Sequence, residues 1–293
     1  FFGKVGRELS LRSSFGDLCV YLFIVLKFIS FLRKTIQQSF QLLKRHSTIP
    51  FKYLRELFMA NIKKKSSYPF MIIRLWPQHH MHEADVNDLL KVLKRNRAAC
   101  DEVWFCTEMG FPLMGVHMQS AKVMAEVAKK IRALGIKTGL QIANTIGHGL
   151  SLLQDDSGAK WPLMIDADGL SSSPTPCPRS KEVLSYIATM TILYANWQPS
   201  SIWIDDDLRM NQHGALKYGC FCSVCVSQFS KVQKKKFNRQ SLVKALHHPK
   251  DGAIRLAWTQ FNSESLAGIG AVIAKATHAV APNCRLGFQQ IGH

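Results

Sequence analysis

The sequence predicts an α/β fold of the (β/α)8 TIM barrel class. Short apolar runs alternate with segments whose apolar residues recur at helical spacing, a pattern typical of parallel strands joined by helices. No glycine-rich phosphate loop follows the first apolar run, and polar or acidic residues follow each expected strand, where barrel active sites lie. Since only about four and a half strand–helix units are recognisable, we expect a barrel truncated after about strand 5.

The expected strands are 69–76, 101–107, 136–143, 201–205 and 285–289. The expected helices are 83–97, 118–134, 179–194 and 253–280, with shorter helical segments before the last one. Between the third strand and the third helix, residues 144–178 are rich in Gly, Ser, Pro and Asp and are expected to form a long loop.

Polar side chains cluster after these strands, and they are the first candidates for a functional site. They are Gln78, His79 and His80 after strand 1, Glu108 after strand 2, Asn144 and His148 after strand 3, Asp205 to Asp207 after strand 4, and Gln289 to His293 after strand 5. The triplet Asp205-Asp206-Asp207 directly follows an apolar strand, which favours a site over a solvated turn. Strand alternation predicts Asp205 and Asp207 on one side and Asp206 on the other.

The basic charge is unevenly distributed. The chain of 293 residues has a net charge of +18, of which residues 1–65 carry +10. We expect 1–58 to be a basic, apolar extension outside the functional fold, and 59–293 to be the domain. A cytoplasmic protein is expected, with a membrane anchor through 15–32 as the alternative if the extension is genuine, because this apolar run is short for a spanning helix.

The eight cysteines do not have the distribution of a secreted disulfide scaffold. Cys220-x-Cys222-x-x-Cys225 is a spacing typical of a metal site, provided that a fourth ligand exists. Cys100, Cys106 and Cys284 lie in or beside strand-like runs and are expected to be buried thiols. A nucleic-acid binder is disfavoured, because paired finger spacing and an aromatic-basic RNA motif are missing from the sequence.

Four segments together resemble the catalytic barrel of glycoside hydrolase family 42, a β-galactosidase type of the large retaining-glycosidase clan. Cys177-Pro178-Arg179-Ser180 is similar to that family's segment before the third helix, and the cluster 220–225 is similar to the rest of its four-cysteine zinc site. Trp203 to Asp207 stands where the family has its strand 4, and Phe261 to Glu264 opens a helix before strand 5. The resemblance covers roughly 67–293.

The resemblance implies a retaining glycoside hydrolase with two catalytic carboxyl groups about 5–5.5 Å apart. It implies that Asp207 is the acid/base, with Asp205 as runner-up, and that Asp206 binds a sugar hydroxyl. Further sugar-binding candidates are Arg74, Trp76, Glu108 and Asn144. It also implies a structural Zn²⁺ on Cys177, Cys220, Cys222 and Cys225.

The sequence departs from the family at the catalytic position, where Asp206-Asp207 replaces Asn-Glu. Because Asp is shorter than Glu, we expect a divergent sibling family. The family's nucleophile lies on strand 7, so this chain alone is expected to be inactive. The expected partner is a carbohydrate, and a homo-oligomer of the intact protein is left open. Two alternatives remain: a divalent-metal enzyme that uses Asp205–Asp207, and a carbohydrate-binding remnant without turnover.

Overall fold

The computed structural model describes residues 70–143, 145–147, 161–210 and 219–289. The chain divides into two compact units, Phe1–Pro69 and Phe70–His293, and the described residues belong to the second unit. The expected extension 1–58 and the alternative membrane anchor therefore lie outside the described residues. Within the described residues, no helix is both long and apolar enough to cross a membrane.

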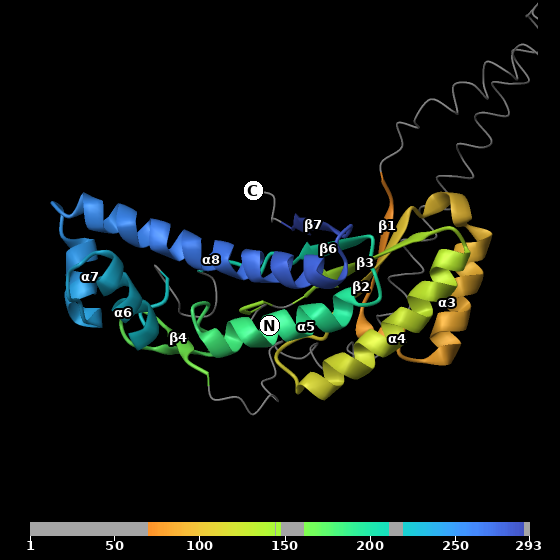
Figure 1. Cartoon of the computed structure of the whole chain (residues 1–293), viewed down its shortest axis with the longest axis horizontal. Helices are drawn as coiled ribbons and strands as arrows, with labels where there is room; N and C mark the ends of the chain where they lie inside the picture. Colours follow the sequence, from red (N-terminus) through yellow and green to blue (C-terminus); the bar gives the residue numbers. More distant parts are fainter. Residues whose placement is uncertain (1–69, 144, 148–160, 211–218, 290–293) are drawn as a thin grey trace, which may run out of the picture. The chain divides into compact units, whose positions relative to one another are not determined.

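A five-stranded parallel sheet forms the centre of this unit, with its strands in the order β1-β2-β3-β6-β7 (Figure 1). The strands are β1 (Ile72–Leu75), β2 (Glu102–Cys106), β3 (Lys137–Ile142), β6 (Ser201–Ile204) and β7 (Arg285–Phe288). Each strand lies beside its predecessor in the sheet, whereas a doubly wound sheet reverses its order. The order therefore matches that of a barrel wall, although the sheet is open, with β1 and β7 at its edges.

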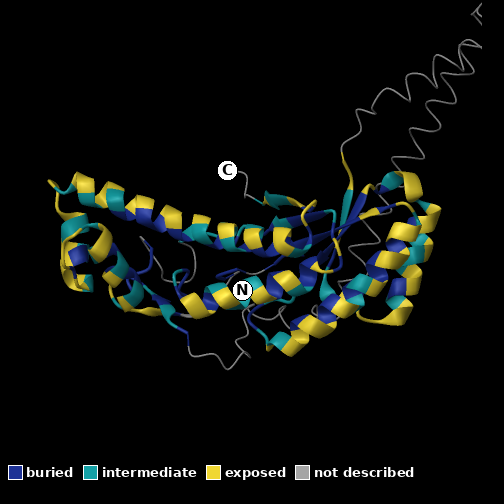
Figure 2. Cartoon of the chain, in the orientation of Figure 1, coloured by how far each residue is buried: buried dark blue, intermediate teal, exposed yellow. Residues whose placement is uncertain are grey.

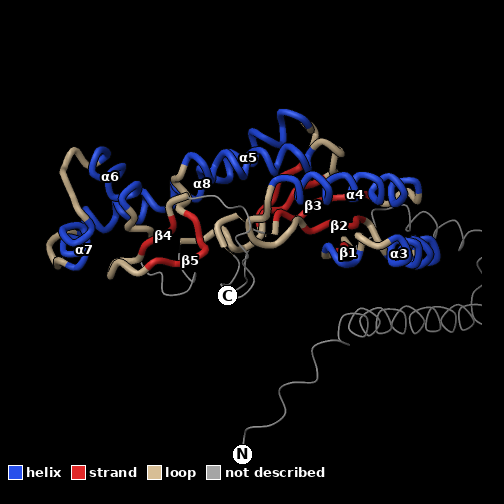
Figure 3. Tube along the Cα trace, turned by 90° about the horizontal axis from the view of Figure 1, so that it is seen from below, coloured by secondary structure: helices blue, strands red, loops and turns tan. Residues whose placement is uncertain are grey.

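Four helices contribute to one hydrophobic core against the sheet. They are α3 (Glu83–Arg95), α4 (Met114–Ala133), α5 (Lys181–Ala195) and α8 (Gly252–Val280). Figure 3 shows α4, α5 and α8 along the same side of the strands. Two 3₁₀ turns, Pro77–His79 and Arg97–Ala99, flank α3. The core contains Leu93, Met124, Ile187 and Ile273, one from each helix, all nearly inaccessible to solvent.

The two faces of the sheet differ in chemistry because side chains alternate along each strand. Val103 and Phe105 point into the helix-covered core, as do Leu140 and Ile202 on the neighbouring strands. The opposite face carries Glu102, Trp104 and Cys106 of β2, Gln141 of β3, and Trp203 of β6. Polar and aromatic groups therefore occupy the face turned away from the helices.

Two glycines make room for the indole rings on that face. The ring of Trp104 stacks on that of Trp203, with centroids 5.0 Å apart. A Cβ added at Gly139 would lie 2.8 Å from Trp104 and 2.6 Å from Ser201, and one at Gly287 would lie 2.5 Å from Trp203. The positions beside the tryptophans on β3 and β7 must therefore lack a side chain.

A second hydrophobic cluster surrounds the four cysteines. Strand β4 (Leu163–Ile165), α6 (Ser223–Val232) and α7 (Arg239–His247) contribute to it, and β5 (Ser171–Pro176) pairs with β4 in an antiparallel hairpin that leads into Cys177. The 29-residue helix α8 serves both clusters, because Trp258 and Phe261 pack with the cysteines while Ile269 and Ile273 pack against the sheet. We call β4, β5, α6, α7 and the first half of α8 the cysteine module.

The structure confirms the five expected strands and the expected helices, and it corrects one segment. The loop expected at 144–178 contains the β4–β5 hairpin. Its strands have no clear sequence signal because Leu163–Ile165 is only three residues long and Ser171–Pro176 contains no alternating apolar residues. The burial of Cys100, Cys106 and Cys284 is confirmed.

Candidate functional site

A chain of polar side chains crosses the face of the sheet turned away from the helices, near the carboxyl ends of the strands. Gln141 is its centre and is fully buried. Its Oε1 accepts hydrogen bonds from Nη1 of Arg74 at 3.3 Å and from Sγ of Cys106 at 3.3 Å. Its Nε2 donates to Oε1 of Gln289 at 2.8 Å. Three strands, β1, β2 and β3, and the residue that follows β7 are connected in this way.

The direction of these hydrogen bonds is fixed by chemistry. Arg74 has only donors, so the Gln141 oxygen must face it, and the Gln141 amide nitrogen must then face Gln289. The guanidinium of Arg74 also lies over the ring of Trp76, 4.8 Å from its centroid. Arg74 and Trp76, both predicted to bind sugar, are thus brought together at the carboxyl end of β1.

Asp205 lies beside this polar chain. Its backbone N–H donates to Ile142 at 3.1 Å, and its side chain is almost fully buried. Burial raises the pKa of the Cys106 thiol to about 12, while the positive charge of Arg74 lowers it and the negative charge of Asp205 raises it. Asp205 follows the strand next to β3, and the carbonyl that it bonds belongs to Ile142, the residue after Gln141.

Asp207 lies in a different environment. Strand β6 ends at Ile204, and the chain turns at Asp206 and Asp207, so the strand alternation expected for the triplet does not continue through it. Oδ2 of Asp207 accepts from the backbone N–H groups of Thr145, Ile146 and Gly147 at 2.7, 3.2 and 3.1 Å. Oδ1 accepts from the Thr145 hydroxyl at 2.8 Å. This carboxylate therefore holds the loop that follows β3.

Complete burial raises the pKa of Asp207 to about 7, against the lowering effect of the hydrogen bonds from Thr145 and Gly147. Asp205 adds to the increase by charge repulsion. The third carboxylate, Asp206, is partly buried and pairs with Arg209 at 3.4 Å.

The remaining candidates have other partners or lie outside the described residues. Glu108 accepts a hydrogen bond from Ser120 of α4. Asn144 and His148 lie outside the described residues. His80, expected to be a polar residue near the site, is instead buried in the interior, with its ring against that of Phe105 at 5.2 Å. That expectation was wrong because the turn at Pro77–His79 folds the following residue back into the core.

Sequence reasoning missed Gln141 as a site residue. A signal was available, because it is a lone amide within the apolar run 136–143. The alternation of that strand places it opposite to Leu140 and Ile142, which face the helices.

The four cysteines predicted to bind metal meet in the cysteine module. Cys177 follows β5, while Cys220, Cys222 and Cys225 precede or begin α6, and all four are buried. Their sulfur atoms lie within 4.8 Å of one another. The Cys177–Cys225 and Cys177–Cys222 sulfur distances are 3.4 and 3.5 Å. Hydrogen bonds from Cys177, Cys220 and Cys225 lower the pKa of Cys222.

This arrangement fits a closed tetrahedral zinc site. With Zn–S bonds of about 2.3 Å, the sulfur atoms of such a site are about 3.8 Å apart. Among the described residues, the four cysteines are the group of potential ligand side chains that converges in this way. Four thiolates would leave no coordination position for water or substrate.

Arg179 connects the cysteine cluster to α8. Its guanidinium lies 3.6 Å from the centroid of the Phe261 ring and donates to the Phe261 carbonyl at 2.9 Å. It also bonds to Ser265 and Gln228, and its charge interacts with Cys225 and Cys177. A positive charge at this position would offset the negative charge of thiolates that hold a metal ion.

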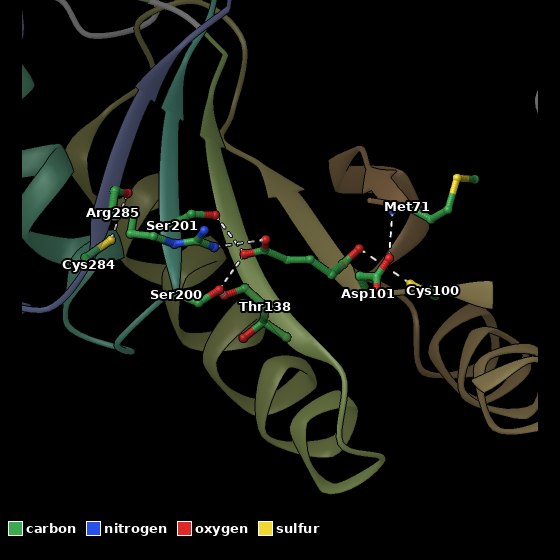
Figure 4. A network of polar contacts seen from close by, with 9 residues as sticks. Met71, Cys100, Asp101, Thr138, Ser200, Ser201, Cys284 and Arg285 are labelled. Atoms are coloured by element: carbon green, nitrogen blue, oxygen red, sulfur yellow. Dashed lines mark hydrogen bonds and ion pairs between the residues drawn. The ribbon is translucent and has the colours of Figure 1, made fainter. Parts of the chain in front are cut away.

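A separate polar network lies at the amino end of the sheet (Figure 4). Glu102 is buried and accepts hydrogen bonds from the hydroxyls of Ser200 and Ser201, the latter at 2.7 Å. Arg285 lies 3.6 Å from the same carboxylate. The network links β2, β6 and β7 at the amino ends of these strands.

No protein-family model matches this chain, and no curated protein matches it. Solved structures do match. A catalytic domain of beta-amylase from Paenibacillus polymyxa aligns over 74% of this chain and 65% of its own, with 12% identity and a TM-score of 0.52. A cold-adapted beta-galactosidase from Rahnella sp. R3 aligns over 76% and 36%, with 15% identity and a TM-score of 0.51. An exo-beta-agarase aligns over 78% and 30%, with 10% identity and a TM-score of 0.42.

These likenesses show the fold and not the family. This chain spans about two thirds of the beta-amylase domain and about one third of the beta-galactosidase. Both are TIM-barrel glycosidases, and the parallel sheet with its helices on one face is similar to a part of such a barrel.

Proposed function

We propose that the chain belongs to a glycoside hydrolase that cleaves O-glycosidic bonds by a retaining mechanism, as a divergent sibling of family 42. One observation carries the proposal. Asp205 directly follows β6, and its backbone N–H bonds to Ile142, the residue after Gln141, whose side chain accepts a hydrogen bond from Arg74. Carboxylates in this position of a barrel-type sheet are where such folds hold catalytic acids.

Asp205 is the proton donor in this proposal, which reverses the order expected from the sequence. A general acid must reach the glycosidic oxygen. Both oxygens of Asp207 are directed into the loop 145–147. Asp207 instead fixes that loop, which follows the strand beside β6.

Arg74 and Trp76 would bind the sugar next to the acid. A guanidinium provides several donors for hydroxyl groups, and an indole ring offers an apolar surface for a sugar ring. Gln141 accepts a hydrogen bond from Arg74, so the guanidinium is oriented before a ligand arrives.

A retaining reaction needs a second carboxylate as nucleophile. The resemblance assigns it to strand 7 of a complete barrel, beyond the five parallel strands described. We therefore propose that the sheet is part of a barrel wall and that β1 and β7 pair with further strands in the catalytic protein. The 293-residue chain then binds sugars without completing their hydrolysis.

The divalent-metal alternative has less support. A cation on Asp205–Asp207 would need oxygen atoms that converge. Asp207 uses its oxygens for backbone N–H groups, and Asp206 pairs with Arg209. A dependence of activity on added Mg²⁺ or Mn²⁺ would favour this alternative over a glycosidase.

Sugar binding by the full 293-residue chain tests the proposal. Ligand-observed NMR with a panel of monosaccharides and aryl glycosides of both anomers should identify at least one ligand. Arg74→Ala should weaken its binding by about tenfold, as expected for about 1.4 kcal/mol of lost hydrogen bonding and stacking. The exposed Arg95 serves as the control, because Arg95→Ala removes the same charge from the surface of α3.

The outcomes separate the alternatives. If a folded chain binds no sugar of the panel, or if both arginine variants behave alike, the proposed site is wrong. If a longer chain that completes the barrel binds sugar but hydrolyses none, the carbohydrate-binding alternative is supported.

We also propose that the cysteine cluster holds a structural Zn²⁺, which would pin the segments before and after β6 to α8. Protein purified without chelator should contain about one zinc per chain. Cys177→Ser should lose the metal, whereas Cys284→Ser, a buried thiol outside the cluster, should retain it. Zinc content that is equal in both variants would contradict the four-cysteine site.

A further inference from the structure

A concentrated positive charge lies on the cysteine module, and the proposed catalytic site does not use it. Residues 66–293 carry a net charge of +8, and 231–255 alone carry +7. The rest of the fold is therefore close to neutral. We call six exposed lysines of this segment the basic surface: Lys231, Lys234, Lys235, Lys236, Lys244 and Lys250.

No carboxylate in the described part of the chain pairs with these six lysines. The segment contains a single acidic residue, Asp251, which lies 3.7 Å from His248. A helix C-terminus favours one or two nearby cations. That effect accounts for Lys231 at the end of α6 and Lys244 at the end of α7, but not for the whole surface.

The three central lysines are held in a fixed loop between α6 and α7. The backbone N–H of Lys235 donates to the Ser230 carbonyl at 3.1 Å, and that of Phe237 donates to the Ser230 hydroxyl at 3.0 Å. The Phe237 ring is buried among the aromatic residues of the module, and Nζ of Lys235 lies 5.1 Å from its centroid. These contacts anchor the loop, and its three lysines, Lys234 to Lys236, are exposed to solvent.

The neighbouring arginines are engaged within the protein. Arg255 donates to the carbonyls of Leu246, His248 and Pro249 at the end of α7. The guanidinium of Arg239 lies so close to Gly169 that an added Cβ there would be 2.6 Å from Nη2. The outward charge is therefore carried by lysines, whose ammonium groups act as point charges on flexible stems.

We propose that the basic surface binds an acidic polysaccharide, a linear glycan that carries sulfate or carboxylate groups. Several lysines along one segment suit a polymer with repeating negative charges, where binding is driven by the release of counterions. Single-stranded nucleic acid is disfavoured because it needs exposed aromatic rings for base stacking, and the ring of Phe237, which lies within this segment, is buried. This inference does not depend on the proposed glycosidase activity.

Binding of the full chain to heparin, as a sulfated glycan, tests the inference. The variant Lys234→Gln/Lys235→Gln/Lys236→Gln removes half of the basic surface. The matched control, Lys122→Gln/Lys129→Gln/Lys130→Gln, removes the same charge from exposed positions of α4. Because both variants retain residues 1–65, any contribution of that basic segment is the same in both.

The basic-surface variant should bind heparin about tenfold more weakly at about 0.1 M salt, with a smaller salt dependence of the binding constant. The heparin affinity of the control variant should stay within about twofold of that of the wild type. Neutral dextran should not bind to the protein. Equal losses in the two variants, or no loss in either, would overturn the inference. Tighter binding of single-stranded RNA than of heparin, lost on the same three substitutions, would also overturn it. Unchanged melting temperatures of both variants verify that they are folded.

Discussion

Asp205 and Asp207 are separated by one residue, yet their carboxylates have different surroundings. Asp207 satisfies three backbone N–H groups of one loop, whereas Asp205 follows β6 next to the strand that carries Gln141, with its backbone N–H bonded to Ile142. Strand alternation in the sequence predicts both on one side of a strand. The difference arises because β6 ends at Ile204, and a strand end within an acidic run has no sequence signal.

The raised pKa of Asp207 predicts a pH-dependent stability. Since the folded-state pKa is about 7 and lies above the ordinary value of 3.8, the folded protein binds this proton more tightly than the unfolded chain does. This contribution to stability is complete below about pH 4 and is lost as the pH rises to about 7. Between about pH 5 and pH 8, the loss should be about 2–3 kcal/mol.

Asp207→Asn is the variant that isolates this effect. Its amide oxygen can accept the three N–H groups, and its amide nitrogen can donate to the Thr145 hydroxyl. We expect the variant to be as stable as the wild type at about pH 5 and more stable at about pH 8, measured by urea unfolding. A difference between the two proteins that stays constant over this range would contradict the assignment.

The hydrogen bonds of the Gln141 side chain lead to a second prediction for a single residue. Gln141→Met keeps the volume but leaves the Gln289 oxygen without its amide donor and Arg74 without its acceptor. We expect a loss of about 1–3 kcal/mol in the free energy of unfolding. Gln233→Met, at the end of α6, removes an amide outside this network and should change stability by less than about 0.5 kcal/mol. Equal effects of the two changes would show that the polar chain contributes nothing.

At the scale of elements, the long periodic segments could be predicted from the sequence, and the short hairpin could not. Strand 136–143 and helix 118–134 have long periodic patterns, and both exist as β3 and α4. The β4–β5 hairpin was missed because its position depends on packing against the rest of the cysteine module rather than on local preference. Its Met164 packs in the second cluster, and Cys177 directly follows it.

Between strands β2 and β3, packing on the sheet face turned away from the helices requires a glycine at position 139. Gly139→Ala would place a methyl group against Ser201, Glu102 and Trp104, all within 2.8 Å. We expect it to destabilise the fold by about 1–3 kcal/mol, because the rings must shift within a packed sheet. Gly268→Ala in α8 meets no atom within 4 Å and should stabilise by about 0.5–1 kcal/mol through helix propensity. Thermal unfolding of both variants checks whether their stability changes have opposite signs. Stability changes of the same sign would refute the packing argument.

At the scale of the whole unit, α8 is the structural link between two hydrophobic clusters. Figure 2 shows buried positions along α8 both near the sheet and near α6 and α7. The sheet cluster includes Cys100 and Cys284, neither of which is a proposed ligand, whereas the second cluster is built around the four proposed ligands. The four proposed metal ligands therefore belong to the second cluster and not to the sheet core.

This division predicts that metal removal acts locally. A structural zinc contributes to folding because its ligands converge only in the folded state. Incubation with a chelator should therefore raise amide hydrogen exchange in 161–178 and 219–247. Strands β2 and β3, whose side chains belong to the sheet cluster, should keep their protection. Re-addition of Zn²⁺ should restore the original pattern, whereas Mg²⁺ should not, because it prefers oxygen ligands. Simultaneous loss of protection in β2, β3 and the cysteine module would show that the two clusters unfold as one unit, and unchanged exchange everywhere would show that the cysteines need no metal.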